Sequence, residues 1–120
     1  MTRSDQKVFL IIFVIAVLIT LSTFRANERA PSGGELFLAC LKSKGVTMFG
    51  TDTCPSCQKQ KELLGEEEFK QVSYVNCDIN PEICTQNNIK KWPTWLYNGQ
   101  ALGGVQTSKE LAQFSGCDAP

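Results

Sequence analysis

Two thiols stand one helical turn apart in the segment Cys54-Pro55-Ser56-Cys57, which a four-residue loop separates from a short apolar segment at residues 46–49. The apolar segment is bounded by glycines and predicts a strand, whereas residues 56–64 are rich in helix-forming residues. Proline is favoured in the first turn of a helix, because its missing N–H would have no partner there in any case. The motif therefore predicts a strand–loop–helix unit that begins its helix at Cys54.

This placement has a chemical consequence, because the thiolate is the nucleophile in disulfide exchange. A cysteine at a helix N-terminus meets unpaired backbone N–H groups and the positive end of the helix dipole, and both favour the thiolate. Cys54 is therefore the candidate nucleophile and Cys57 the candidate resolving thiol. Two other interpretations are an inert disulfide and half of a zinc site. Zinc ribbons need a second such knuckle or histidines, and the chain has no histidine.

The first part of the chain predicts a membrane segment. Residues 8–24 are uncharged and almost wholly apolar, and Arg3 and Lys7 precede them. A spanning helix needs roughly 20 apolar residues, with about 17 as the lower limit. We expect residues 1–25 to be a membrane anchor or a signal peptide, with a buried helix as the remaining alternative. Residues 26–34 are polar, contain Pro31 and a Ser-Gly-Gly run, and predict a linker.

Residues 35–120 predict one α/β domain. Helices are expected over residues 35–44, 54–64, 81–88 and 108–114, and strands over 46–49, 72–75, 94–97 and 101–105. A helical crossover makes the first two strands parallel, and the Asn98-Gly99 turn makes the last two antiparallel. The chain has 12 basic and 12 acidic residues, so charge gives no indication of a nucleic-acid partner, and none is expected.

Two segments, VTMFGTDTCPSC and KKWPTWLYNGQALGG, resemble the thioredoxin superfamily over about residues 35–117. The chain looks most like the small thioredoxin-like domains that accompany bacterial homologues of vitamin K epoxide reductase. The resemblance implies a four-stranded mixed sheet flanked by helices, placed after an N-terminal transmembrane helix. It also implies catalytic Cys54 and Cys57, substrate binding at Trp92, Pro93 and Thr94, and a cis Pro93 beside the reactive sulfurs.

The same resemblance implies protein dithiols or disulfides as substrates and a membrane redox partner similar to a vitamin K epoxide reductase homologue. The thiol pair itself is the redox group, and no metal or other cofactor is expected. The chain departs from thioredoxin at Thr53, where thioredoxin has tryptophan, and in its Pro-Ser dipeptide. It also lacks an evident buried acid, although Asp52 and Asp78 are near in sequence. These departures leave the direction of electron flow open.

Two alternatives remain at this point. One is an anchored glutaredoxin-like enzyme, which Cys-Pro-x-Cys and Gly103-Gly104 resemble, although Val105-Gln106 replaces the acidic pair usual after those glycines. The other is a non-catalytic thioredoxin-fold module that binds a partner and carries inert disulfides. A redox titration separates the inert module from both enzymes, and dependence on glutathione identifies the glutaredoxin.

Four further cysteines are candidates for structural disulfides. Cys77 closes a strand and Cys84 lies in the next short helix, so a local disulfide is reasonable, with buried free thiols or a relay as alternatives. Cys40 and Cys117 remain, and pairing them would join the two ends of the domain. All six cysteines follow the apolar run, which favours a single-pass topology with the soluble domain on the oxidising, extracytoplasmic side.

Overall fold

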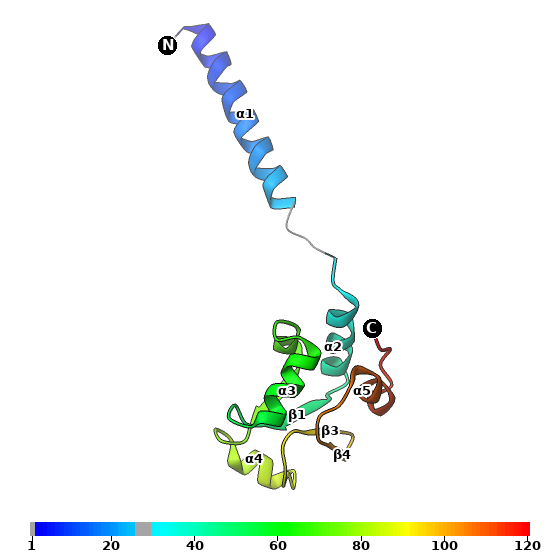
Figure 1. Cartoon of the computed structure of the whole chain (residues 1–120). Coiled ribbons are helices and arrows are strands. Elements are labelled where there is room, and N and C mark those ends of the chain that lie inside the picture. Colours follow the sequence, from blue (N-terminus) through cyan, green and yellow to red (C-terminus); the bar gives the residue numbers. More distant parts are fainter. Residues whose placement is uncertain (1, 26–29) are drawn as a thin grey trace. The chain divides into compact units, whose positions relative to one another are not determined.

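The computed structural model describes residues 2–25 and 30–120, which fall into two compact units that divide between Ala30 and Pro31. In the first unit, helix α1 (Arg3–Arg25) has 23 residues (Figure 1). At 1.5 Å per residue its length is about 34 Å, compared with about 30 Å for the hydrocarbon core of a bilayer. Its large apolar side chains from Val8 to Leu21 are exposed. By length and composition, α1 is therefore able to cross a membrane.

The second unit begins with a capped helix, α2 (Gly33–Ser43). Ser32 Oγ accepts a hydrogen bond from the Glu35 N–H at 3.2 Å, and the Glu35 carboxylate accepts one from the Ser32 N–H at 2.6 Å. This reciprocal pair fixes the helix start before Glu35. Residues 33 and 34, expected in the linker, therefore belong to the helix, and residues 26–29 of that linker lie outside the described residues.

The sheet of the second unit has four strands in the order β2-β1-β3-β4. They are β1 (Thr47–Gly50), β2 (Ser73–Asn76), β3 (Thr94–Tyr97) and β4 (Gln100–Gly103). Strands β1 and β2 are parallel, and β3 and β4 are antiparallel, as predicted. The turn between β3 and β4 has positive φ at both Asn98 and Gly99, the conformation that a two-residue hairpin requires. β4 ends earlier than expected, ahead of Gly104 with its φ of 93°.

The remaining elements are α3 (Pro55–Leu64), the 3-10 helix η1 (Glu68–Gln71), α4 (Pro81–Gln86) and α5 (Ser108–Ser115). The three α-helices agree with the sequence analysis, whereas η1 was not expected. With helices flanking a mixed four-stranded sheet, the architecture is a thioredoxin-like fold, which confirms the predicted fold class.

The two faces of the sheet hold separate buried clusters. Met48 packs with Leu38 of α2, Cys57 of α3 and Leu111 of α5. The next residue along β1, Phe49, points to the other face and packs with Cys77 and with Cys84 of α4. This alternation follows from the two-residue period of a strand, and it places α4 across the sheet from α2 and α5 (Figure 1).

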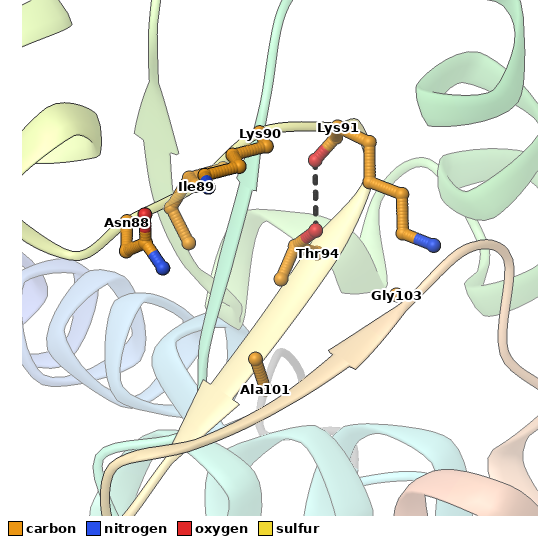
Figure 2. Close-up of a pocket in the computed structure, with 7 residues that line it drawn as sticks. All are labelled: Asn88, Ile89, Lys90, Lys91, Thr94, Ala101 and Gly103. Atoms are coloured by element: carbon orange, nitrogen blue, oxygen red, sulfur yellow. Dashed lines mark hydrogen bonds between the residues drawn. The ribbon is translucent and has the colours of Figure 1, made fainter.

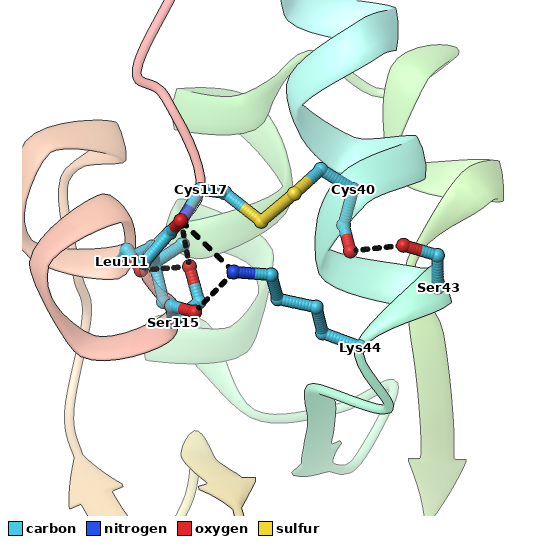
Figure 3. Close-up of a disulfide and its surroundings, with 7 residues drawn as sticks. Cys40, Ser43, Lys44, Leu111, Ser115 and Cys117 are labelled. Carbon is cyan, nitrogen blue, oxygen red and sulfur yellow. Dashed lines mark hydrogen bonds between the residues drawn. A yellow bond between two sulfur atoms is a disulfide. The ribbon is translucent and has the colours of Figure 1, made fainter.

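Two disulfides lie in this unit. Cys40 of α2 bonds to Cys117 after α5, with the sulfurs 2.02 Å apart, and Cys77 bonds to Cys84 at 2.06 Å. Beside the first disulfide, Lys44 Nζ donates to the carbonyls of Ser115 and Gly116 at 2.9 Å each (Figure 3). The start and the end of the domain are thus joined by a covalent bond and by the hydrogen bonds that Lys44, at the end of α2, donates to the C-terminal end of α5.

Candidate active site

Cys54 is the N-cap residue of α3, with an extended backbone (φ −76°, ψ 118°). Its Sγ accepts a hydrogen bond from the backbone N–H of Cys57 at 3.2 Å, and its side chain is partly exposed. A backbone donor at a helix N-terminus stabilises negative charge on the atom that it contacts. The structure therefore gives Cys54 both features that a nucleophilic thiol needs, access from solvent and a donor for the thiolate.

Cys57 lies behind Cys54 and has no exposed surface. Burial raises the pKa of the Cys57 thiol to about 11, and its hydrogen bond with the Cys54 side chain acts in the same direction. A backbone hydrogen bond from Thr51 and the charge of Lys61 oppose the rise. Cys54 and Cys57 are free thiols in the structure, in contrast to the other four cysteines.

Gly50, the last residue of β1, supplies the space for the Cys57 sulfur. A Cβ atom at this position would stand 2.7 Å from Cys57 Sγ, closer than real contacts allow. The same point is 3.4 Å from Cε2 of Tyr74 on β2. The absence of a side chain at Gly50 is therefore a packing requirement, because it lets Cys57 lie directly on the end of the sheet.

The register of the sheet brings Pro93 to the same end. Phe49 pairs with Thr94 at the end of the antiparallel β1–β3 ladder, and Gly50 and Pro93 are the next residues beyond this last pair. The Trp92–Pro93 peptide bond is cis. Pro93 is buried, and its carbonyl accepts the N–H of Gly104 at 2.7 Å. Trp92 is 46% exposed, whereas Trp95 is fully buried in the core.

A hollow of about 290 Å³ lies next to the segment at residues 88–91, which precedes Trp92 (Figure 2). Thr94 lines it, and the Thr94 hydroxyl donates to the carbonyl of Lys91 at 2.7 Å. The Lys91 side chain lies over Gly103, where an added Cβ would stand 2.6 Å from its Cε. The hollow is thus lined by strands β3 and β4 and by residues 88–91, the segment that leads into Trp92.

A polar cluster that the sequence analysis did not identify surrounds Asp52, two residues before Cys54. The Asp52 carboxylate accepts hydrogen bonds from Lys61 Nζ at 3.2 Å, from the Tyr74 hydroxyl at 3.2 Å and from Asn76 Nδ2 at 2.8 Å. The hydrogen bond from Lys61 is the main cause that lowers the pKa of Asp52. The other acid noted in the sequence, Asp78, is exposed. The sequence carried one signal for this cluster, because Lys61 follows Cys57 at the four-residue spacing that shares a helix face.

Comparison with known proteins identifies a curated relative of part of the chain. No protein-family model matches the chain. A curated relative, the thiol-disulfide oxidoreductase LTO1 of Arabidopsis thaliana, is 33% identical over 84 residues, which cover 63% of this chain and 22% of the relative. The chain thus spans about a fifth of the length of the relative that it matches. This similarity supports a thioredoxin-like oxidoreductase as the interpretation of the two free thiols.

Proposed function

We propose that this chain is a membrane-anchored thiol-disulfide oxidoreductase, in which Cys54 and Cys57 exchange disulfides with protein substrates. The observation that carries the proposal is the arrangement of the two free thiols. Cys54 is accessible and receives a backbone hydrogen bond at a helix start, and Cys57 is buried one turn behind it. The similarity to a relative named as a thiol-disulfide oxidoreductase supports the same chemistry.

The reaction follows from this order of access. The Cys54 thiolate attacks one sulfur of a substrate disulfide, the new bond joins Cys54 to the substrate, and the second substrate sulfur leaves with the electron pair and takes a proton. Cys57 then loses its proton and attacks Cys54 Sγ. The Cys54–substrate bond breaks, the substrate leaves as a dithiol, and Cys54–Cys57 becomes a disulfide. In the reverse direction, an oxidised pair donates its disulfide to a substrate dithiol.

Substrate binding is assigned to Trp92, Pro93 and Thr94. The β1–β3 ladder supports this assignment, because Pro93 comes directly beyond its last pair, as does Gly50, the glycine that packs on Cys57. Pro93 has no N–H, and Gly104 already occupies its carbonyl, so the buried proline offers shape and not hydrogen bonds. Trp92 beside it has an exposed ring that is suited to contact with a protein substrate.

The location of the domain is the second part of the proposal. We assign α1 as an uncleaved anchor and place the thioredoxin-like domain on the extracytoplasmic side of the membrane. The two disulfides outside the active pair support an oxidising compartment, because such bonds are rare where glutathione keeps thiols reduced. Cys40–Cys117 and Cys77–Cys84 are then structural bonds, and neither takes part in exchange.

A redox partner completes the cycle. Each turnover leaves Cys54–Cys57 in the opposite redox state, so a second redox agent must restore it before the next turnover. An anchored domain reaches partners in the same membrane at high effective concentration. We therefore propose a membrane redox partner, similar to the homologues of vitamin K epoxide reductase whose accompanying domains the sequence resembles.

A redox titration of the full chain in detergent tests the proposal. Equilibration with dithiothreitol buffers should give one reversible two-electron couple at Cys54–Cys57, within the range of about −120 to −270 mV found for redox-active members of this fold. A pair that stays oxidised well below about −300 mV would behave as a structural disulfide and would support the inert binding module. Turnover that depends on glutathione would instead favour the glutaredoxin-like enzyme.

A further inference from the structure

Lys61 holds an unusual position among the described lysines, because two aromatic rings and a carboxylate enclose its ammonium group. Lys61 Nζ lies 4.7 Å from the centre of the Tyr74 ring and 5.5 Å from that of Phe69. Asp52 Oδ1 lies 3.2 Å from the same nitrogen. Only 20% of the Lys61 side chain is exposed, compared with 63% for Lys59 on the same helix. Its charge is therefore screened less by water than that of an ordinary surface lysine.

The position of Lys61 on α3 relates it to Cys57. Lys61 follows Cys57 by four residues on α3, and residues at this spacing lie on the same helix face. Both residues also adjoin the Tyr74 ring. Lys61 lies over the ring, while Cys57 Sγ and Tyr74 Cε2 both lie within 3.4 Å of the point where a Gly50 side chain would begin. Tyr74 thus fills the space beside the buried thiol and supports the lysine.

The other ionisable groups around Cys57 do not compete for this role. From the loop before α3 comes Asp52, and from β2 comes the neutral phenol of Tyr74. From η1, the element packed against α3, the Phe69 ring contacts Lys61. The charged residues next to Phe69 in the sequence make other contacts. Lys70 pairs with Glu67 at 2.6 Å, and the Glu68 carboxylate lies over Gly65. The charge of Lys61 does act on Cys57.

We propose that Lys61 stabilises the thiolate of Cys57 while the Cys54–Cys57 disulfide closes, and that Asp52 and Tyr74 hold its ammonium group in place. The inference rests on the proposed oxidoreductase function. In the step concerned, Cys57 gives its proton to solvent, its thiolate forms the bond to Cys54 Sγ, and the substrate sulfur leaves with the electron pair. Lys61 neither gives nor takes a proton, so it is a positioning residue that acts through Cys57.

The protonation properties of the cluster agree with this division of roles. The charge of Lys61 opposes the rise that burial causes in the pKa of Cys57. Asp52 is badly suited to be the base for this step, because its pKa lies below the usual range and the pKa of the thiol is about 11. An efficient general base has a pKa close to the pH at which it works. The cluster therefore stabilises the anion and does not collect the proton.

The test measures disulfide closure directly in the detergent-solubilised full chain. Reduced protein is mixed with dithiodipyridine, an uncharged aromatic disulfide that releases one coloured thione when Cys54 attacks and a second when Cys57 closes the bond. Lys61→Met should raise the apparent pKa of the second phase by about one unit, which lowers the thiolate fraction at pH 7 about tenfold. A more basic thiolate is also more nucleophilic, so the net closure rate should fall about threefold to fourfold.

Three variants complete the test. Lys61→Arg should restore the wild-type pH profile, and Lys61→Gln should reproduce that of Lys61→Met. Lys59→Met, which removes an exposed lysine from the same helix, should leave the profile unchanged. A Lys61→Met profile that matches wild type, or one that is slower by the same factor at every pH with no change in apparent pKa, would overturn the inference. A wild-type protein without a second phase would overturn the proposed oxidoreductase function itself, and the inference with it.

Discussion

The side-chain amide of Gln60 forms two hydrogen bonds with the backbone of Gln106, accepting its N–H at 2.7 Å and donating to its carbonyl at 2.9 Å. The same Gln60 oxygen accepts the indole N–H of Trp95 at 3.2 Å. Gln60 has no exposed surface, so the three hydrogen bonds form in the interior. They join α3, the helix that carries Cys57, to strand β3 and to the segment after β4.

Removal of the Gln60 amide should therefore destabilise the fold. Gln60→Ala leaves three polar groups of Trp95 and Gln106 without partners in the interior, and each buried polar group without a partner costs about 1–3 kcal/mol. We expect the free energy of unfolding to fall by about 2–4 kcal/mol, since water entering the cavity replaces part of the loss. Urea unfolding of the oxidised protein measures this change. The control, Gln113→Ala on the exposed side of α5, should stay within about 0.5 kcal/mol of wild type.

The two active-site thiols should differ in trapping experiments. Cys57→Ala removes the thiol that resolves the intermediate, so mixed disulfides with substrate should accumulate through Cys54. Cys54→Ala leaves a buried thiol with a raised pKa and should trap little. Non-reducing gels of cells that express each variant give the comparison. Equal trapping by the two variants would reverse or abolish the assignment of nucleophile and resolving thiol.

The exposed ring of Trp92 should contribute to protein substrates and not to small ones. Trp92→Ala removes a ring that is 46% exposed, so the fold should be retained. We expect exchange with a protein disulfide to slow about 5-fold to 30-fold, the effect of losing about 1–2 kcal/mol of contact. The rate with dithiothreitol should change less than twofold. Leu36→Ala, which truncates a residue that is 57% exposed on α2, is the matched control. A similar loss with both kinds of substrate would show that Trp92 acts on the thiols and not on the substrate.

The buried thiol should make the stability of the reduced protein depend on pH. Burial raises the pKa of Cys57 from an ordinary value of 9.0 to about 11, so between these values the folded state keeps a proton that the unfolded state releases. The contribution of Cys57 is therefore fully present below pH 9 and is lost as pH rises toward 11. Thermal unfolding of the reduced protein from pH 7 to 11 measures the loss. Cys57→Ala should show a shallower decline, and the part that remains reports Tyr74, whose pKa burial also raises. Identical slopes for the two proteins would contradict the burial of an ionisable thiol at this position.

The location of the domain is testable in whole cells. After mild reduction, a maleimide that does not cross membranes should label Cys54 in intact cells, because the proposed topology places this partly exposed thiol outside the cytoplasm. A Cys54→Ala variant controls for labelling elsewhere. Protection of Cys54 until the cells are lysed would place the domain on the other side. A mature protein that begins after Ser22 or Ala26 would identify a signal peptide in place of an anchor.

Much of the fold is predictable from local patterns. The Asn98-Gly99 turn, the strand before Cys54 and the proline at the start of α3 each specify their own conformation, and the structure has the elements that they predict. Residues 33 and 34 were expected in the linker because two glycines usually weaken a helix. The hydrogen bonds between Ser32 and Glu35 outweigh that tendency and begin the helix earlier.

The site itself was only partly predictable. The two cysteines carry their own chemistry and are recognisable from their spacing. The cluster around Lys61 is not, because its members come from the loop before α3, from α3, from β2 and from η1, and only the β1–β2 pairing brings them together. Likewise, the position of Gly50 and Pro93 at the same end of the sheet depends on the antiparallel register of β1 and β3, which no local pattern specifies.

The alternation of Met48 and Phe49 along β1 has a consequence for disulfide exchange within the domain. Cys57 packs with Met48 on one face of the sheet, whereas the Cys77–Cys84 disulfide packs with Phe49 on the other. The sheet thus separates the active pair from the Cys77–Cys84 disulfide. A thiolate that forms at the active pair has no straight path to Cys77–Cys84, so repeated cycling should leave that bond intact, whereas Cys40–Cys117 lies on the same face as the active pair.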